Sequence, residues 1–251
     1  SKDCPNIPAV IRNLEIDLKS FSISSNNSAD YQAFNIEECP NESRFDLKTQ
    51  EEDTITKISL CVPGKHNISN AVAAMAVCKL LGVSIKDSAG CLANFTGAKR
   101  RFEYKGEAAG ITLIDDYAHH PTAVRLLLSA AKNKYPKRRI IIAFQPHQYS
   151  RTRMMLKNFA ESLLGADLVI VPNIFFARDT EDDIKSLNPQ ALTDKVRALG
   201  TEACYIGELS STVSYLSEIL KEGDVLILAG AGDIDTIAEP LLSLLKRRGR
   251  S

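Results

Sequence analysis

Residues 111–121 read ITLIDDYAHHP: a mainly apolar run, two acidic residues, a tyrosine, two histidines and a proline. The run ITLID (111–115) has the short apolar character of a strand that is buried on both faces. Pro121 suits the first position of a helix, and the apolar spacing predicts that helix over residues 121–133. A buried strand that leads at once into a helix is typical of a parallel sheet with helices on both sides. The stretch therefore predicts an α/β fold.

The same alternation of apolar strands and amphipathic helices continues to the C-terminus. Further strands are expected at 139–145, 167–174, 203–207 and 224–230, with helices at 151–164, 189–199, 210–221 and 234–247. This order predicts a doubly wound α/β domain built on a parallel sheet. Functional groups in such domains gather outside the carboxyl ends of the strands.

The first part of the chain has a different pattern. Residues 1–63 are polar, and short β-like pieces separated by turn residues predict an antiparallel meander with strands at 14–24, 31–39, 43–49 and 56–62. After Pro63, apolar residues three or four positions apart predict an amphipathic helix that ends at Gly82. A shorter helix is expected over 85–95.

The composition excludes several classes of protein. The 251 residues include 31 basic and 31 acidic ones, so the formal net charge of +0 gives no reason to expect nucleic acid or an anionic membrane as a partner. No apolar run approaches the ~18 residues that cross a bilayer, and the N-terminus lacks a signal-peptide core, so no membrane insertion is expected. The six cysteines form no CxxC pair and no zinc-like spacing with histidine, which favours reduced thiols and a cytoplasmic location.

Polar groups cluster after the first two predicted strands of the α/β region. They are Asp115, Asp116, Tyr117, His119, His120, Gln145, His147 and Arg151. If these strands are neighbours, the groups meet at one rim of the sheet, where they can hold a nucleotide, a metal ion or a carboxylate substrate. Any one of them can instead be a helix cap or a turn residue. GAGDID (230–235) lacks the third glycine of GxGxxG, so it is either a nucleotide turn or a plain strand-to-helix turn.

Five motifs carry a resemblance to a known family. In chain order they are PGKHNISNAVAA (63–74), FTGAKRRFE (95–103), DDYAHHP (115–121), FQPHQYSRT (144–152) and GAGDI (230–234). Together they resemble the Mur ligase family, and DDYAHHP followed by FQPH resembles its alanine-adding members and their near relatives. The resemblance implies that residues 1–105 are the end of a central ATPase domain. It implies that residues 106–251 are a Rossmann-like C-terminal domain.

The chemistry implied by the resemblance is ATP-dependent amide-bond formation. Family members use ATP and Mg2+ to convert the carboxylate of UDP-N-acetylmuramate into an acyl phosphate, which the amine of L-alanine then attacks. The family's P-loop and most of its metal ligands precede the part matched here, so no metal ligand is assigned and the chain alone is expected to be inactive. A hinge between the two domains is expected over 102–110, at Gly106 and Gly110.

The resemblance also assigns nucleotide-binding residues. His66, Asn67 and Asn70 match adenine-contacting positions, although the two asparagines can also cap a helix that starts near Ser69.

In the α/β region, Arg101 and Asp116 match positions that reach ATP, and a carboxylate at Asp116 suits the ribose hydroxyls. With His119 they are the candidate catalytic residues. Arg100 is expected to be a solvated neighbour, and Asp115 is expected to pair with it or with another cation.

The implied L-alanine pocket is lined by Tyr117, His119 and His147. Many relatives have an arginine where this chain has Gln148, so Arg151 is expected to supply the charge that holds the alanine carboxylate.

Three functions stay open. The first is the C-terminal part of an alanine-adding ligase. The second is a recycling ligase of the same family, which attaches a preformed peptide to the same sugar nucleotide, and FQPH after the second strand argues against it. The third is a stand-alone, non-catalytic Rossmann-like binding module.

Overall fold

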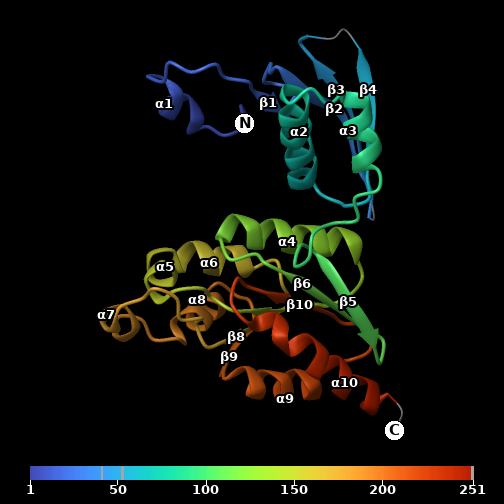
Figure 1. Cartoon of the computed structure of the whole chain (residues 1–251). Coiled ribbons are helices and arrows are strands. Elements are labelled where there is room, and N and C mark those ends of the chain that lie inside the picture. Colours follow the sequence, from blue (N-terminus) through green and yellow to red (C-terminus); the bar gives the residue numbers. More distant parts are fainter. Residues whose placement is uncertain (41, 52–53, 250–251) are drawn as a thin grey trace. The chain divides into compact units, whose positions relative to one another are not determined.

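The chain divides into two units, Ser1–Gly97 and Ala98–Ser251 (Figure 1). The computed structural model describes residues 1–40, 42–51 and 54–249. The division lies before the boundary that the resemblance placed after residue 105, because strand β5 (Glu103–Ala108) pairs antiparallel with β6 (Ile111–Asp116) inside the second unit. Gly106 and Gly110 therefore lie in a β-hairpin, and the hinge expected there is wrong.

In the described part of the first unit, one sheet has the strand order β1-β2-β3-β4. Its strands are β1 (Phe21–Ser22), β2 (Tyr31–Glu38), β3 (Ser43–Thr49) and β4 (Ile55–Leu60). Strands β2, β3 and β4 form the expected antiparallel meander, whereas β1 pairs parallel with β2. The strand expected over 14–24 is thus wrong except at β1. Leu14, Ile16 and Leu18 are exposed, so their alternation with polar residues faces no core in the described chain.

Helices α2 (Lys65–Leu80) and α3 (Ile85–Leu92) pack on this sheet, and a short α1 (Ile7–Ile11) precedes it. Helix α2 begins at Lys65 after Gly64, whose φ of +102° is a conformation that favours glycine. The expected start near Ser69 is therefore wrong. Neither Asn67 nor Asn70 occupies the N-cap position.

The second unit is a six-stranded sheet with the order β5-β6-β10-β7-β8-β9 among its described residues. Its other strands are β7 (Ile140–Phe144), β8 (Leu168–Pro172), β9 (Ala203–Gly207) and β10 (Val225–Ala229). All pairs except β5–β6 are parallel, which confirms the doubly wound α/β fold. Strand β10 lies between β6 and β7, so the two strands expected to be neighbours are not.

Helices cover both faces of this sheet (Figure 1). They are α4 (Pro121–Lys134), α5 (Tyr149–Met154), α6 (Leu156–Leu163), α7 (Glu181–Lys185), α8 (Ala191–Ala198), α9 (Leu209–Ile219), the 3-10 turn η1 (Ile234–Ile237) and α10 (Ala238–Arg248). The helix expected over 151–164 is interrupted at Met155. His120 caps α4, since its Nδ1 accepts from the backbone N–H of Thr122.

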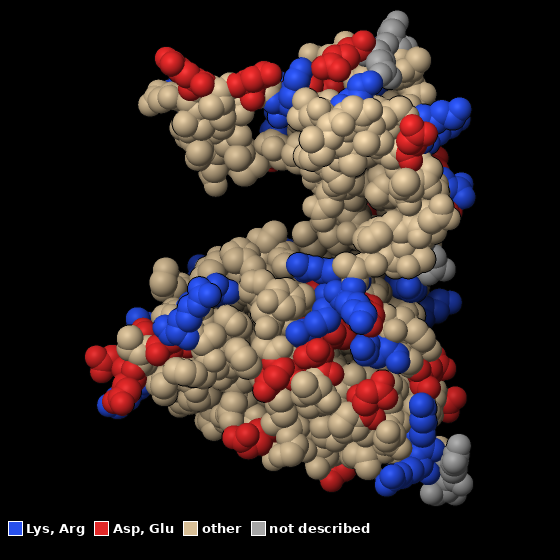
Figure 2. All heavy atoms as spheres, viewed as in Figure 1, with Lys and Arg blue, Asp and Glu red and all other residues tan. Residues whose placement is uncertain are grey.

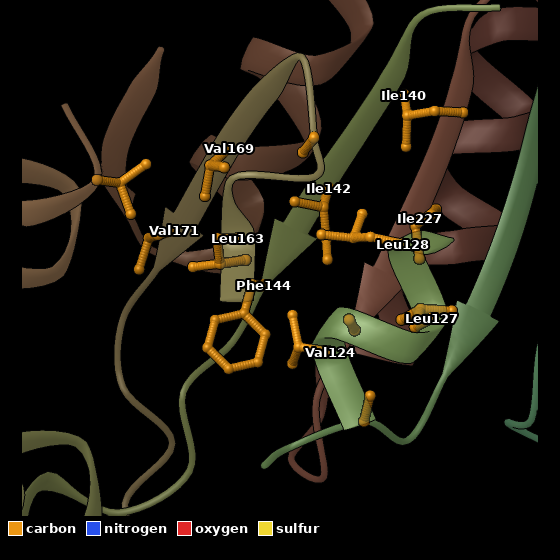
Figure 3. Close-up of a cluster of buried hydrophobic side chains, with 14 of the residues drawn as sticks. Val124, Leu127, Leu128, Ile140, Ile142, Phe144, Leu163, Val169, Val171 and Ile227 are labelled. Carbon is orange, nitrogen blue, oxygen red and sulfur yellow. The ribbon is translucent and has the colours of Figure 1, made fainter. Parts of the chain in front are cut away.

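Strand β7 shows why both faces are covered. Ile140, Ile142 and Phe144 belong to one hydrophobic cluster, where they meet helices α4 and α6, while Ile141 and Ala143 belong to the cluster under α9 and α10. Figure 3 shows the side chains of the first cluster converging from β7, β8 and α4. A strand that is apolar at every position needs such burial on both sides.

Charged side chains of both signs lie on the surface of the described chain. On the face shown in Figure 2, acidic and basic side chains are interspersed over the described surface. Within the described residues, no helix combines the length and apolar character required to cross a membrane.

Candidate functional site

The carboxyl ends of β6, β10 and β7 meet at one rim of the second unit's sheet. Gly230, directly after β10, donates its N–H to the carbonyl oxygen of Asp116 over 3.1 Å. Gln145, directly after β7, donates its backbone N–H to Ala229 over 2.8 Å. Because β10 lies between the other two strands, the turn after β10 is in the middle of the predicted cluster.

The turn at residues 230–235 is held by the side chain of Gln145. Its amide nitrogen donates to Asp233 over 2.7 Å, and its amide oxygen accepts from the N–H of Ile234 over 3.1 Å. A β-carbon at Gly230 would lie 2.8 Å from the Gln145 carbonyl oxygen, and one at Gly232 would lie 2.5 Å from the Phe175 ring. Close packing alone therefore accounts for both glycines, which supports the strand-to-helix turn.

Asp116 is buried, and its carboxylate organises the neighbouring backbone. One oxygen accepts from the N–H of Phe102 over 2.7 Å and the other from Ala118 over 2.8 Å. Both oxygens thus have local partners. This geometry supports a role for Asp116 in placing other residues of the rim.

Arg100 is not a solvated neighbour. Its guanidinium is largely buried, lies 3.2 Å from the Asp115 carboxylate and 3.4 Å from that of Asp235, and donates to the carbonyl oxygens of Gly230 and Gly232 over 2.7 and 3.1 Å. The pairing expected for Asp115 is confirmed. Burial raises the pKa of Asp115 to about 6, since it outweighs the opposing effect of Arg100.

Arg101 and Tyr117 are exposed at the same place. The Arg101 guanidinium lies 5.5 Å from the centroid of the Tyr117 ring, and that of Arg100 lies 5.2 Å from it. Among the described residues, Arg101 has no carboxylate within ion-pair distance, so its charge is available to an anionic ligand.

The rings of Tyr117, His119 and His147 form a row along the rim, and Phe175 extends it. The ring of His119 meets that of Tyr117 edge-on at 5.2 Å and lies 6.2 Å from that of His147, which in turn stacks on Phe175 at 5.4 Å. His119 Nδ1 lies 2.9 Å from the carbonyl oxygen of Tyr117. The structure therefore brings together the three residues predicted to line an alanine pocket.

His147 is held as a neutral base. Burial lowers its pKa, and the positive charge of Arg151 lowers it further. Its Nδ1 is buried and has no hydrogen-bond partner in the described structure. This nitrogen is thus a buried polar atom without a partner beside the row of rings.

Gln148 faces the protein and is unsuited to grip a carboxylate. Its side-chain amide donates to the carbonyl oxygen of Ala177 over 2.8 Å, and its backbone φ of +72° is unusual for a residue with a side chain. Arg151, in the last turn of the short helix α5, is half-buried and has no acidic partner among the residues described. Of the two, only Arg151 offers a free charge.

The loop after β8 completes the site, and the sequence reasoning missed it. Asp179 accepts hydrogen bonds from the N–H groups of Tyr149 and Ser150, 3.0 and 3.1 Å away, and so fixes the start of α5. Burial alone would raise the pKa of Asp179, but the hydrogen bonds from Ser150 and Tyr149 prevail and lower it. The contacts of Phe175 and Asp179 depend on which strands are neighbours, so no local pattern could indicate them.

The candidate adenine residues lie in the first unit. Asn67 donates its side-chain amide to the carbonyl oxygen of Pro63 over 2.8 Å and thereby secures the loop before α2. His66 is half-buried and Asn70 is exposed. In the described parts of both units, no three histidine, cysteine or acidic side chains lie close enough together to hold a metal ion.

Two family models, both of Mur ligase domains, match this chain. Residues 100–232 match the family described as "Mur ligase, glutamate ligase domain", and residues 2–78 match the "Mur ligase middle domain". The chain belongs to the Mur ligase family.

Individual members of the family are similar to this chain over almost its whole length. The UDP-N-acetylmuramate–L-alanine ligase of Caldanaerobacter subterraneus subsp. tengcongensis is 40% identical over 250 residues, which are 98% of this chain and 52% of the relative. The enzyme of the same name from Salinibacter ruber is 37% identical over 98% of this chain and 51% of its own length. This chain thus spans about half the length of the curated relatives it matches.

Two solved structures share the fold. The UDP-N-acetylmuramate–alanine ligase of Thermotoga maritima has a TM-score of 0.72 at 26% identity, over 93% of this chain and 48% of that one. A murein peptide ligase from Psychrobacter arcticus has a TM-score of 0.69 at 25% identity, over 90% of this chain and 46% of that one.

Proposed function

We propose that this chain is part of a UDP-N-acetylmuramate–L-alanine ligase and contains its amino-acid pocket. The row formed by Tyr117, His119 and His147, next to the free guanidinium of Arg151, carries the proposal. L-Alanine needs a cation for its carboxylate and space for one methyl group, and a ring-lined surface beside an arginine offers both. The names of the two curated relatives support this assignment.

The pocket also supplies a proton acceptor. The ammonium group of L-alanine must lose a proton before its nitrogen attacks an activated carboxylate. The pKa of His147 lies below its usual value, so its imidazole is neutral at pH 7 and can accept that proton. We assign proton transfer to His147 and orientation of its ring to Phe175, on which it stacks.

ATP supplies the phosphoryl group that activates the muramyl carboxylate. In the first unit, the exposed amide of Asn70 offers both a donor and an acceptor for adenine, and we group His66 and Asn67 with it. In the second unit, Arg101 offers unpaired positive charge for phosphate, with Asp116 and His119 as its neighbours. The described residues do not fit Mg2+, and the ion takes part in none of the steps assigned to them.

We place the reaction in the cytoplasm. The six cysteines are all unpaired, as a reducing compartment requires. The proposed substrates are UDP-N-acetylmuramate and L-alanine.

A recycling ligase is the second candidate. The likeness to the murein peptide ligase of Psychrobacter arcticus favours it, since the TM-score of 0.69 is close to that of the alanine ligase. Its substrate would be a preformed peptide, whose extra residues need an open end at the same rim.

Phosphate release by the full-length protein that contains this chain tests the proposal. Release should depend on UDP-N-acetylmuramate together with L-alanine, and a tripeptide should be a poor replacement. Preference for the tripeptide would support the recycling ligase. Absence of ATP turnover with either acceptor would contradict both and favour a binding module.

The pocket is tested by two histidine variants of the same protein. Substitution of His147→Ala should raise the KM for L-alanine by about tenfold or more with little change in the KM for ATP. His120→Asn is the matched control, because asparagine preserves the cap of α4 and should leave both KM values unchanged. Equal increases in both KM values for His147→Ala would place this residue outside the amino-acid pocket.

A further inference from the structure

Arg100 is the point at which three segments of the second unit are joined. Its guanidinium bonds to the carbonyl oxygens of Gly230 and Gly232 after β10 and pairs with Asp115 at the end of β6. Asp235, at the start of η1, pairs with the same group. An arginine can do this because its planar fork presents five N–H donors in fixed directions, which a lysine does not.

The backbone around Arg100 has an unusual conformation. Arg100 and Phe102 have φ angles of +55° and +49°, in the left-handed region that residues with side chains seldom occupy. The N–H of Arg100 donates to Glu103 over 2.7 Å, and the N–H of Phe102 donates to Asp116 over 2.7 Å. Both left-handed residues are thus held by carboxylates.

This conformation determines where Arg101 lies. Arg101 is between the two left-handed residues, and it is exposed while Arg100 is anchored below it. The ring of Tyr117 lies against both guanidinium groups, and the backbone N–H of Tyr117 donates to the Arg100 carbonyl oxygen over 2.8 Å. A change in the anchor would therefore displace both Arg101 and Tyr117.

The anchor is poorly optimised for stability. Both carboxylate oxygens of Asp115 are buried, and no donor among the described residues makes a hydrogen bond to them, although Arg100 lies within ion-pair distance. A buried ion pair without good hydrogen-bond geometry recovers little of its desolvation cost. A role in placing other groups gives a reason for this charge to lie here.

We propose that Arg100 is a positioning residue, which locks the turn at residues 230–235 to the segment 100–102 and so presents Arg101 to a phosphate-bearing substrate and holds Tyr117 beside it. The effect on catalysis rests on the proposed function. The locking itself does not, since it is a property of the free protein.

Amide hydrogen exchange tests the locking without any substrate. In Arg100→Lys, exchange at Tyr117, Phe102 and Gly230 should be about tenfold faster or more, while exchange in β8, away from these contacts, should be unchanged. Arg125→Lys, at an exposed position on α4, is the control and should change none of these amides. Unaltered exchange in Arg100→Lys would overturn the proposal whatever the protein catalyses.

A double-mutant cycle in the full-length protein tests the functional part. Arg100→Lys and Arg101→Ala should each raise the KM for ATP by about tenfold, and the double variant should resemble Arg101→Ala alone, because Arg100 acts through Arg101. Effects that multiply would show independent roles and overturn the proposal. If Arg100→Lys does not fold, Asp235→Asn is the replacement variant, because it removes only one ion pair of Arg100. It should raise the KM for ATP by a smaller factor. An unchanged KM for ATP in Asp235→Asn would contradict the proposal.

These outcomes separate the two proposals. If the wild-type protein shows no ATP-dependent turnover, the proposed function fails while the exchange result still decides whether Arg100 locks the rim. If turnover is normal and exchange in Arg100→Lys is unchanged, only the positioning role fails.

Discussion

Replacing Asp115 by asparagine should stabilise the second unit at neutral pH, even though it removes one partner of a buried ion pair. Asp115 is fully buried and its pKa is raised from 3.8 to about 6. At any pH between 3.8 and about 6, this carboxyl group therefore binds more protons in the folded state than in the unfolded state. Its contribution to stability is therefore present below about pH 4 and is lost as the pH rises through 6.

The size of the effect follows from the shift. A difference of about two pH units, at 1.36 kcal/mol per unit, makes the folded state about 3 kcal/mol less stable at pH 7 than at pH 4 through this group alone. Asparagine has nearly the same shape and does not ionise. Asp115→Asn should thus match the wild type at pH 4 and exceed its stability by up to about 3 kcal/mol at pH 7.

Native-state hydrogen exchange is the appropriate assay. The chain contains no tryptophan and has two units, so a single spectroscopic transition would not report on the second unit alone. Strand β7 lies inside the sheet of that unit, so we expect its amides to exchange through global unfolding of the unit. Comparing variant and wild type at the same pH cancels the intrinsic pH dependence of exchange.

Asp179→Asn provides a control of opposite sign. The pKa of Asp179 is lowered, so its contribution to stability is present above its ordinary pKa and is lost in acid. Because this change lies below its ordinary pKa of 3.8, the asparagine variant should lose stability relative to the wild type as the pH rises from about 2 to about 5, with a constant difference above that. If Asp115→Asn instead behaved like Asp179→Asn, the attraction of Arg100 would outweigh the desolvation of Asp115, and the reasoning would be refuted.

Two further substitutions test the packing at opposite ends of the sheet. The side chain of Arg138 donates four hydrogen bonds, to the carbonyl oxygens of Gly110, Gly223 and Asp224 and to the Thr112 hydroxyl. Arg138→Met should therefore lower the free energy of unfolding by about 3 kcal/mol or more, measured by amide exchange in β7, and a loss below about 1 kcal/mol would contradict this. A methyl group at residue 232 would lie 2.5 Å from the Phe175 ring, which stacks on His147. Gly232→Ala should therefore displace that ring and shift the His147 imidazole resonances in NMR spectra. Unchanged resonances would show that the turn accommodates the methyl group without moving Phe175 or His147.

The sequence predicted elements whose burial is visible locally. The residues of β7 and β10 are apolar at every position, and only a sheet covered on both faces buries such a strand. Strand β5 was missed because Tyr104 is exposed and three of its other positions, Glu103, Lys105 and Glu107, are charged, as is usual for an edge strand. The insertion of β10 between β6 and β7 is set by long-range pairing, which no local pattern contains.

The same limit applies to the site. His119 and His147 could be found from residue type and from their places after strands, and the structure brings their rings within 6.2 Å. Phe175 reaches His147 from a third loop, so its contact follows from strand order. Arg100 was expected to be solvated because a run of basic residues gives no indication of which member is buried.

The two ends of the sheet differ in how well their charged groups are hydrogen-bonded, and this difference alone indicates which end is the functional site. At the amino ends of β6, β7 and β10, Arg138 has four hydrogen bonds and Arg139 meets Asp224 with two, at 2.9 and 2.7 Å. These charges are well satisfied and stabilise the fold.

At the carboxyl ends, by contrast, Asp115 is buried without a hydrogen-bond donor in the described structure, and His147 keeps an unpartnered ring nitrogen. Gln148, Arg100 and Phe102 have left-handed backbone angles there. Each such feature costs about 1 kcal/mol or more, and a fold selected for stability alone would not concentrate them at one rim. Strain and unsatisfied charge are typical of sites that are arranged for a ligand, so this rim is where variants that increase stability should most often reduce activity.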